Sequence, residues 1–284
     1  MRSVRPTVKN VAFLPIPSQP RRIAECIYCG ATGVPLTREH AVPYGLNGPW
    51  TLLEASCSEC REITHRFERD ALRDMLSAVR AVLAFQTRRP RERPRTLPLV
   101  IEDQGQRRVV QLPLSEYPLY LPSPVWLEPG VIAGRPTASP IGFRLEFRHL
   151  AGPTFEAVAA RFQPCDFVGA RLTFAPPEFA RMIAKVAFCA AVHAIGIDAL
   201  RQSPIRAVIL GESPDIAHWV GAWSGEEMNR PAGLHAIQLR SAGSQLHVVV
   251  RLFAQFGAPE YHVVLGEAPE DFVNSDAWPW KNEA

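Results

Sequence analysis

Apolar residues recur with a helical period in two stretches of the chain. In the first, the apolar positions after Cys60 repeat every three to four residues: Ile63, Phe67, Leu72, Met75, Leu76, Val79 and Leu83. In the second, the same spacing runs through Phe179, Met182, Ile183, Val186 and Ala190, with a proline near its start and Gly196 at its end. The pattern therefore predicts a long helix after Cys60 and another over 177–195.

Short apolar runs typical of β-strands follow the second helix. They occupy four ranges: 207–210, 235–239, 246–253 and 261–265. The glycine and proline of 257–259 separate the last two runs and indicate a hairpin loop. We expect these elements to form an α+β domain with a mostly antiparallel sheet.

Proline divides the chain. Ten prolines lie within residues 90–140, where they oppose long helices and central strands. We therefore interpret the chain as an N-terminal extension, a cysteine-bearing domain, a linker with edge or irregular structure, and a separate α+β domain: 1–22, 23–88, 89–140 and 141–284.

Composition excludes several classes of protein. Hydrophobic residues make up 47% and charged residues 21%, which is the balance of a globular protein and excludes global disorder. The most apolar stretch, 182–197, is interrupted by Lys185 and His193 and is shorter than a membrane span of about 20 residues. The first 20 residues hold no apolar signal core. The expected setting is cytoplasmic, without a membrane partner.

The positive charge is concentrated in one segment. Residues 61–95 hold ten arginines and five acids, whereas the whole chain has a net charge of only +3. A local basic stretch of this kind is typical of a polyanion partner, and it also occurs on solvated helix faces.

Four of the six cysteines form two C-x-x-C pairs: Cys26, Cys29, Cys57 and Cys60. In a reducing compartment such pairs point to metal rather than to disulfides. Two pairs complete a closed, tetrahedral site for structural Zn²⁺. The 27-residue separation between the pairs leaves room for a substantial element between them.

That element is a predicted hairpin. Leu36-Thr-Arg-Glu-His-Ala-Val-Pro43 reads as a short strand, Gly45-Leu-Asn-Gly48 as a turn and 52–56 as a second strand. With the two C-x-x-C pairs, each forming a turn called a zinc knuckle, and with the following helix, residues 23–70 resemble the HNH nuclease family and its ββα-metal motif. The resemblance implies a small, treble-clef-like zinc domain.

The resemblance also implies roles for individual residues. Glu39 matches the family's acidic metal ligand, His40 its general base, and Asn47 the residue that orients this base. Arg61 stands where close relatives carry a metal ligand, and arginine does not ligate a cation. Either His65 replaces that ligand, with Glu62 as a lesser candidate, or the catalytic metal site is degraded.

The leading hypothesis is thus a metal-dependent HNH-type endonuclease that hydrolyses DNA, with one Mg²⁺ or Mn²⁺ beside the structural zinc. Arg61, Arg66 and Arg69 are the expected nucleic-acid contacts, and 88–95 is either a further contact or a solvated linker. The alternatives are a zinc-stabilised nucleic-acid-binding module that has lost catalysis and a protein adaptor. Residues 141–284 would select targets, regulate or form a homodimer.

Three histidines of the C-terminal part fall on predicted strands: His235, His247 and His262. No cysteine or carboxylate accompanies them at ligand spacing, so we interpret them as core or surface residues rather than as a metal site.

Overall fold

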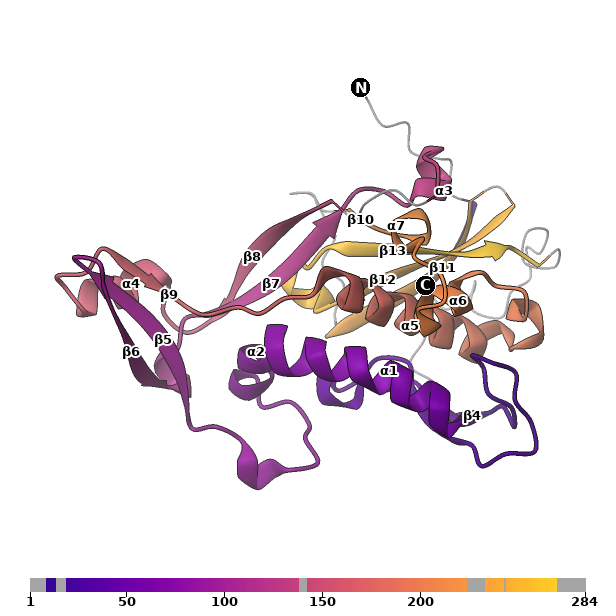
Figure 1. The fold of residues 1–284 in the computed structure, drawn as a ribbon, viewed down its shortest axis with the longest axis horizontal. Coiled ribbons are helices and arrows are strands. Elements are labelled where there is room, and N and C mark those ends of the chain that lie inside the picture. The colour runs from indigo at the N-terminus through magenta and orange to yellow at the C-terminus, as the bar shows by residue number, and fades with distance from the viewer. Residues whose placement is uncertain (1–8, 14–18, 138–141, 224–232, 243, 270–284) are drawn as a thin grey trace.

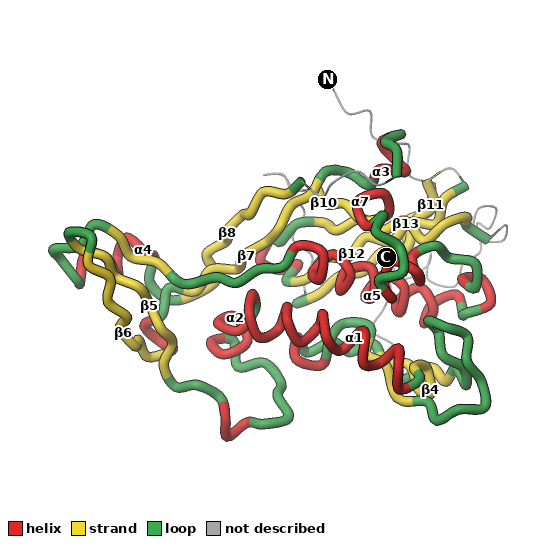
Figure 2. The backbone as a smooth tube through the Cα atoms, in the orientation of Figure 1, coloured by secondary structure: helices red, strands yellow, loops and turns green. Residues whose placement is uncertain are grey.

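A computed structural model of the chain describes residues 9–13, 19–137, 142–223, 233–242 and 244–269. Most of the expected N-terminal extension therefore lies outside the described residues. The described chain forms a layered main body and an arm that projects from it (Figure 1). In the main body, helix α5 lies between a large sheet and a layer made by helix α1 and a small hairpin (Figure 2).

The large sheet has five strands in the order β1-β11-β12-β13-β10, and every pair in it is antiparallel. Its strands are Lys9–Phe13 (β1), Val220–Trp223 (β10), His235–Ala242 (β11), Gln245–Leu252 (β12) and Glu260–Glu267 (β13). Three of the four expected strand runs lie in this sheet, so the predicted α+β class with a mostly antiparallel sheet is confirmed.

The long helix α5 spans Pro176–Ile195 and ends at Gly196, whose φ of +91° closes the helix. Its residues from Phe179 to Val192 are all buried except Arg181, which is half-buried. A helix that is apolar on every face belongs between two packed layers. Three short helices accompany it: Gly130–Ala133 (α3), Ile205–Leu210 (α6) and Ile216–Trp219 (α7).

The predicted hairpin and helix are both present. Strands Thr37–His40 (β3) and Thr51–Ser56 (β4) pair antiparallel, and Arg21–Arg22 (β2) adds a short parallel strand to the other edge of β4. Helix α1 covers Ser58–Asp70, continues through a π-helical turn at Ala71–Met75, and is followed by α2 at Ser77–Val82. The chain order here is strand, strand, helix.

The range 89–140, which the proline pattern assigns to a linker, contains three eight-residue strands. Thr96–Asp103 (β5) pairs with Gln106–Pro113 (β6) and with Phe167–Gly169 (β9), while Leu119–Trp126 (β7) pairs with Phe143–Ala151 (β8). β7 and β8 form a two-stranded ribbon, so both are edge strands, which tolerate proline. β5 is the middle strand of its sheet, but its pairing with β9 covers only Val100 to Glu102 and does not include Pro98.

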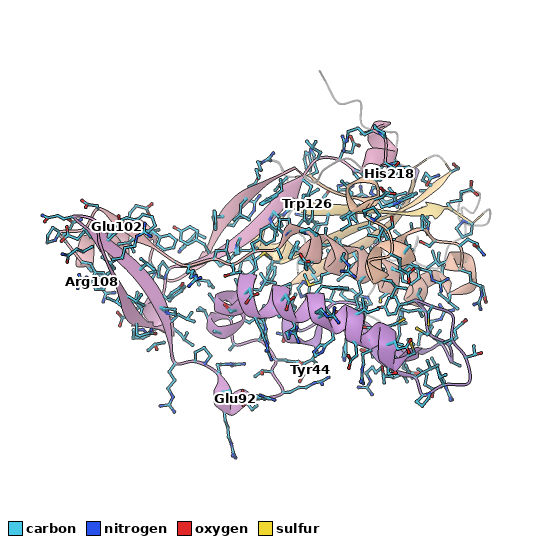
Figure 3. All side chains as sticks on the ribbon, viewed as in Figure 1. Tyr44, Glu92, Glu102, Arg108, Trp126 and His218 are labelled. Atoms are coloured by element: carbon cyan, nitrogen blue, oxygen red, sulfur yellow. The ribbon has the colours of Figure 1, made fainter. Side chains whose placement is uncertain are left out.

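Together with helix α4 (Phe155–Arg161), strands β5, β6 and β9 form the arm. A small separate core stabilises it, which includes Leu97, Leu99, Leu112 and Val158. Figure 3 shows Glu102 and Arg108 on this arm, on one side of the main body and away from Tyr44 and Glu92.

One expected strand is wrong. Ala207–Leu210 forms the end of α6, which closes with Gly211 in the left-handed region at φ +78°. Four apolar residues fit a buried strand and a buried helical turn equally well, so periodicity cannot separate the two. The Gly211 cap decides in favour of the helix.

A single hydrophobic core joins the hairpin, α1, α5 and the large sheet. Phe67 of α1, Ile183 of α5 and Val250 of β12 all belong to it. The residues assigned by sequence to a cysteine-bearing domain and to a C-terminal domain therefore share one core. No helix among the described residues has the length and apolarity needed to cross a bilayer.

Candidate functional site

The four paired cysteines meet at one point. Their Sγ atoms all lie within 4.8 Å of one another, and those of Cys29 and Cys57 are 3.8 Å apart. None of the cysteines forms a disulfide. Four thiols at this separation can hold a single metal ion. The sequence prediction that these residues form one centre is confirmed.

Local backbone geometry explains how the two knuckles form. Gly30, at φ +79°, donates its N–H to the Cys26 carbonyl at 2.8 Å, which turns the chain tightly around the first pair. Cys57 precedes the first turn of α1, and its carbonyl accepts from the N–H of Arg61 at 3.0 Å. A metal in this centre would therefore tie the turn before the hairpin to the beginning of α1.

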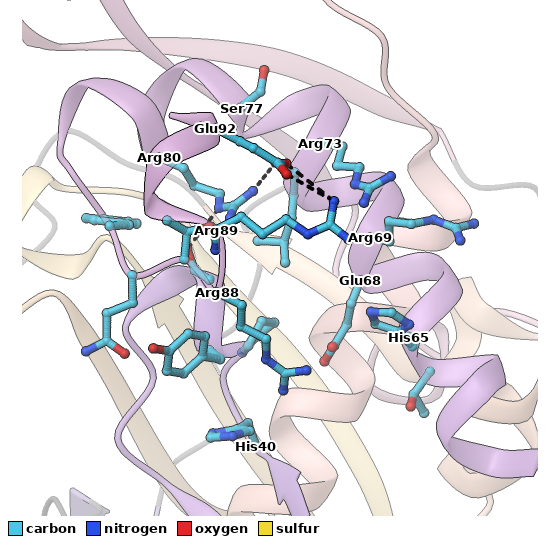
Figure 4. Close-up of a pocket in the computed structure, with 18 of the residues that line it drawn as sticks. His40, His65, Glu68, Arg69, Arg73, Ser77, Arg80, Arg88, Arg89 and Glu92 are labelled. Carbon is cyan, nitrogen blue, oxygen red and sulfur yellow. Dashed lines mark hydrogen bonds and ion pairs between the residues drawn. The ribbon is translucent and has the colours of Figure 1, made fainter. Parts of the chain in front are cut away.

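A groove of about 950 Å³ lies beside this centre, between the hairpin, α1, α2 and the segment 85–94 (Figure 4). Four glutamates line it, and twice as many arginines: Arg38, Arg61, Arg69, Arg73, Arg80, Arg88, Arg89 and Arg93. No ion pair within the described part of the chain involves Arg38, Arg61, Arg73 or Arg88. The groove is therefore strongly basic.

His40 lies at the end of β3 on the wall of this groove. Its Nδ1 is 3.4 Å from the Thr51 hydroxyl of the paired strand. Partial burial and the charge of Lys185 lower the pKa of His40, and Glu39 opposes that effect. The imidazole is consequently neutral near pH 7 and able to accept a proton.

Arg88 extends into the space between His40 and the side of α1 that carries His65 and Glu68 (Figure 4). Its guanidinium contributes to the lowered pKa of His40. A phosphate placed there would meet a fixed positive charge on one side and a neutral imidazole on the other.

A fully buried lysine contacts the backbone of His40 from the protein interior. The ammonium of Lys185, on α5, lies 2.8 Å from Oε1 of Glu39 and 2.7 Å from Oε1 of Glu68. It also donates to the carbonyl oxygens of His40 and Ala41. Burial disfavours this charge, but the two carboxylates outweigh burial and raise the pKa of Lys185. The hairpin, α1 and α5 are thus joined at one charged point.

Two further contacts fix the loop of the hairpin. Arg80 of α2 donates to the Gly45 carbonyl at 3.0 Å and to the Leu72 carbonyl at 3.1 Å. His235 of β11 donates through Nε2 to the Leu46 carbonyl at 2.7 Å. The walls of the groove are therefore held from α2 and from the large sheet.

The predicted site residues divide into two groups. His40, His65 and Glu62 line the groove, as do Arg61 and Arg69. Arg66 lies on another side of α1, near Arg181, and is absent from the groove lining. Asn47 accepts a hydrogen bond from the Gln86 N–H at 2.8 Å, so its amide ties the hairpin loop to the chain after α2.

The predicted catalytic metal ligands belong to no group of three or more ligands among the described residues. Glu39 is directed to Lys185, and it forms no group with His40 and His65 whose ligand atoms all lie within 4.8 Å. Among the described residues, only the four cysteines form such a group. The C-terminal histidines form none either: His247 and His262 pair with each other at 3.0 Å.

Sequence reasoning missed Lys185 and Glu68. A signal for Lys185 was present, because it is the single charged residue within the apolar run 182–192. A charge inside an otherwise apolar helix requires a buried partner of opposite charge. The partner itself carries no such signal, since Glu68 lies among other charged residues of α1.

Comparison with known proteins adds no relative to this picture: the chain matches no family model, no curated protein and no solved structure.

Proposed function

We propose that this protein binds nucleic acid in the basic groove, on a scaffold stabilised by zinc. The observation that carries the proposal is the set of eight arginines that line one groove, contributed by the hairpin, α1 with its π-helical turn, α2 and the segment 85–94. Guanidinium groups recognise phosphate through paired hydrogen bonds, and a phosphate backbone supplies repeated anions along such a groove. We propose Zn²⁺ for the four-thiol centre, because tetrahedral thiolate sites favour this ion.

The geometry supports nucleic acid over the protein-adaptor alternative. Of the eight arginines, Arg69 and Arg89 form ion pairs and Arg80 and Arg93 donate to backbone carbonyls. The other four have neither kind of contact among the described residues, so they are available to a partner with closely spaced anions. An adaptor surface would be expected to present apolar anchors at its centre. DNA is the proposed partner. A homodimer through residues 141–284 remains a separate proposal.

Removing groove arginines is expected to weaken DNA binding. Arg73→Gln and Arg88→Gln each remove one phosphate contact, and each should raise the Kd for a short duplex roughly 3- to 10-fold without sequence preference. Fluorescence anisotropy at fixed ionic strength measures this. Arg66→Gln is the matched control, because Arg66 lies on α1 outside the groove. Equal affinity in all three variants would place the nucleic acid elsewhere.

A second candidate function is hydrolysis of the bound phosphodiester, as the resemblance to HNH nucleases implies. The observation that favours it is His40, a neutral imidazole on the groove wall beside Arg88. In this proposal His40 takes the proton from the attacking water, and arginines stabilise the charge of the transition state. We also propose, as part of this resemblance, that the strand-strand-helix unit is a treble-clef-like zinc domain.

The metal-dependent form of this hydrolysis fits the residues less well. It needs Glu39 as a ligand, and the carboxylate of Glu39 is paired with Lys185 at 2.8 Å. His65 is exposed on the opposite wall and belongs to no group of three or more metal-ligating side chains among the described residues. Nucleic-acid binding is therefore proposed first, and hydrolysis second.

If the protein cleaves DNA, His40→Ala is expected to slow cleavage by about 10²- to 10⁴-fold, because only the general base is lost. Its DNA affinity should stay close to that of the wild type, since no groove arginine changes. Plasmid nicking, with and without added Mn²⁺, provides the rate. Cleavage by His40→Ala at the wild-type rate would remove His40 from the mechanism, and the binding function would stand alone.

A further inference from the structure

Four oxygen atoms converge on one buried point between β3, α1 and α5. Two are the carboxylate oxygens of Glu39 and Glu68, and two are the carbonyl oxygens of His40 and Ala41. Carboxylate and carbonyl oxygens are the ligands that Mg²⁺, Mn²⁺ and Ca²⁺ prefer. These four oxygens therefore form the kind of coordination environment that a divalent cation requires, next to the backbone of His40.

The group at the centre of these oxygens is the ammonium of Lys185. We propose that Lys185 permanently takes the place of a divalent cation in this site, so that the groove engages a phosphodiester without Mg²⁺ or Mn²⁺. The statement about the phosphodiester rests on the proposed function, whereas the statement about the cation does not.

Charge and hydrogen bonding explain why Lys185 excludes a metal. Its side chain is 0% exposed, and the two carboxylates hold it in the charged form. A divalent ion among the same oxygens would have to displace the ammonium into an apolar core, where an unpaired charge is strongly unfavourable. The arginines around the groove add further repulsion toward an entering cation.

The same contacts make Lys185 a positioning residue for His40. The ammonium holds the His40 carbonyl, while Thr51 of the paired strand lies beside its ring. Positive charge for a bound phosphate then comes from Arg88 and its neighbours rather than from a metal. The site obtains its internal cation from the same helix that packs against the large sheet.

Titration of the zinc-loaded full chain with Mn²⁺, followed by the loss of the free-ion electron paramagnetic resonance signal, tests the proposal directly. Free metal ions should be removed from the buffer with a chelating resin, because a soluble chelator would compete for the thiol-bound ion. The wild type is expected to bind no Mn²⁺ at Glu39, so its Mn²⁺ uptake should equal that of Glu39→Gln. Uptake by the wild type that Glu39→Gln abolishes would overturn the proposal. Mn²⁺ that Glu39→Gln still takes up is bound at another site, and this result agrees with the proposal.

Lys185→Met supplies the positive arm of the experiment. Methionine has the shape of a lysine without its terminal nitrogen, so this variant vacates the position of the ammonium and leaves both carboxylates in place. It is therefore expected to gain one Mn²⁺ site. Lys185→Met/Glu39→Gln should lose that site again. Failure of Lys185→Met to bind Mn²⁺ while folded would overturn the proposal. If the variant does not fold, the wild type and Glu39→Gln decide the question by themselves.

DNA affinity gives an independent readout. At constant ionic strength, adding Mg²⁺ is expected to change the wild-type Kd by less than about twofold. A Kd that falls tenfold or more with Mg²⁺, and does so only when Glu39 is present, would contradict the proposal. Absence of any DNA binding, combined with no Glu39-dependent Mn²⁺ uptake, would reject the proposed function alone and leave the role of Lys185 intact.

Discussion

Cys60→Ser is expected to lose the bound metal and to lose cooperative unfolding of the region around the hairpin. Cys60 is buried, and its thiol is one of the four that meet within 4.8 Å. Structural zinc contributes about 10 kcal/mol or more to the folding of small zinc modules, which is comparable with the whole stability of a domain, so loss of the ion is expected to unfold this region. Metal content by mass spectrometry and thermal unfolding by circular dichroism measure the two effects.

Cys165→Ser is the matched control for this substitution. Cys165 lies outside the metal centre, and its thiol donates to the Ala159 carbonyl at 3.5 Å, a bond that a serine hydroxyl can replace. It should keep both the metal and the melting temperature. Purified wild-type protein without zinc, or Cys60→Ser with an unchanged melting temperature, would show that the thiols are not a structural metal centre.

Lys185→Ala is expected to destabilise the fold by about 3–5 kcal/mol, the usual effect of breaking a buried ion pair. The substitution leaves Glu39 and Glu68 facing each other without the ammonium that neutralises them. Urea denaturation gives the free energy of unfolding. The triple variant Lys185→Met/Glu39→Gln/Glu68→Gln should recover most of the loss, because no charge then remains buried. A triple variant as unstable as Lys185→Ala would mean that packing, not charge, is responsible.

The pH dependence of Lys185→Ala should reveal the same cause. Burial raises the pKa of Glu68 even while Lys185 opposes that effect. Without the ammonium, the folded protein holds on Glu68 a proton that the unfolded chain releases near pH 4. Because the folded state then binds more protons, the variant gains stability as pH falls from neutrality toward about 4. A variant whose stability deficit is independent of pH would contradict this account.

Local spacing made the four-thiol centre and the hairpin predictable. The C-x-x-C pairs bring two ligands each to one turn, and only one element separates them, so the four thiols must meet if the hairpin folds. The long helix 177–195 was similarly predictable, because a period of 3.6 over many residues has few other structural meanings. In the structure it covers Pro176–Ile195.

Contacts between distant segments were not predictable in this way. Glu39 has the sequence context of a metal ligand, but its partner is Lys185 on a helix far along the chain. Asn47 likewise bonds to Gln86 rather than to the neighbouring His40. For 89–140 the proline pattern predicted edge or irregular structure, whereas β5 is the middle strand of a three-stranded sheet. The strand tolerates Pro98 because its pairing with β9 covers only Val100 to Glu102, and sequence alone does not show where such a pairing stops.

The salt dependence of DNA binding tests the central claim, a phosphate-binding groove, most directly. Each arginine–phosphate contact contributes about 0.9 to the slope of log K against log salt for duplex DNA. The triple variant Arg61→Gln/Arg73→Gln/Arg88→Gln should therefore bind more weakly and with a slope about 3 units shallower than that of the wild type. The same slope in both proteins, or a wild-type affinity that salt does not change, would contradict the claim.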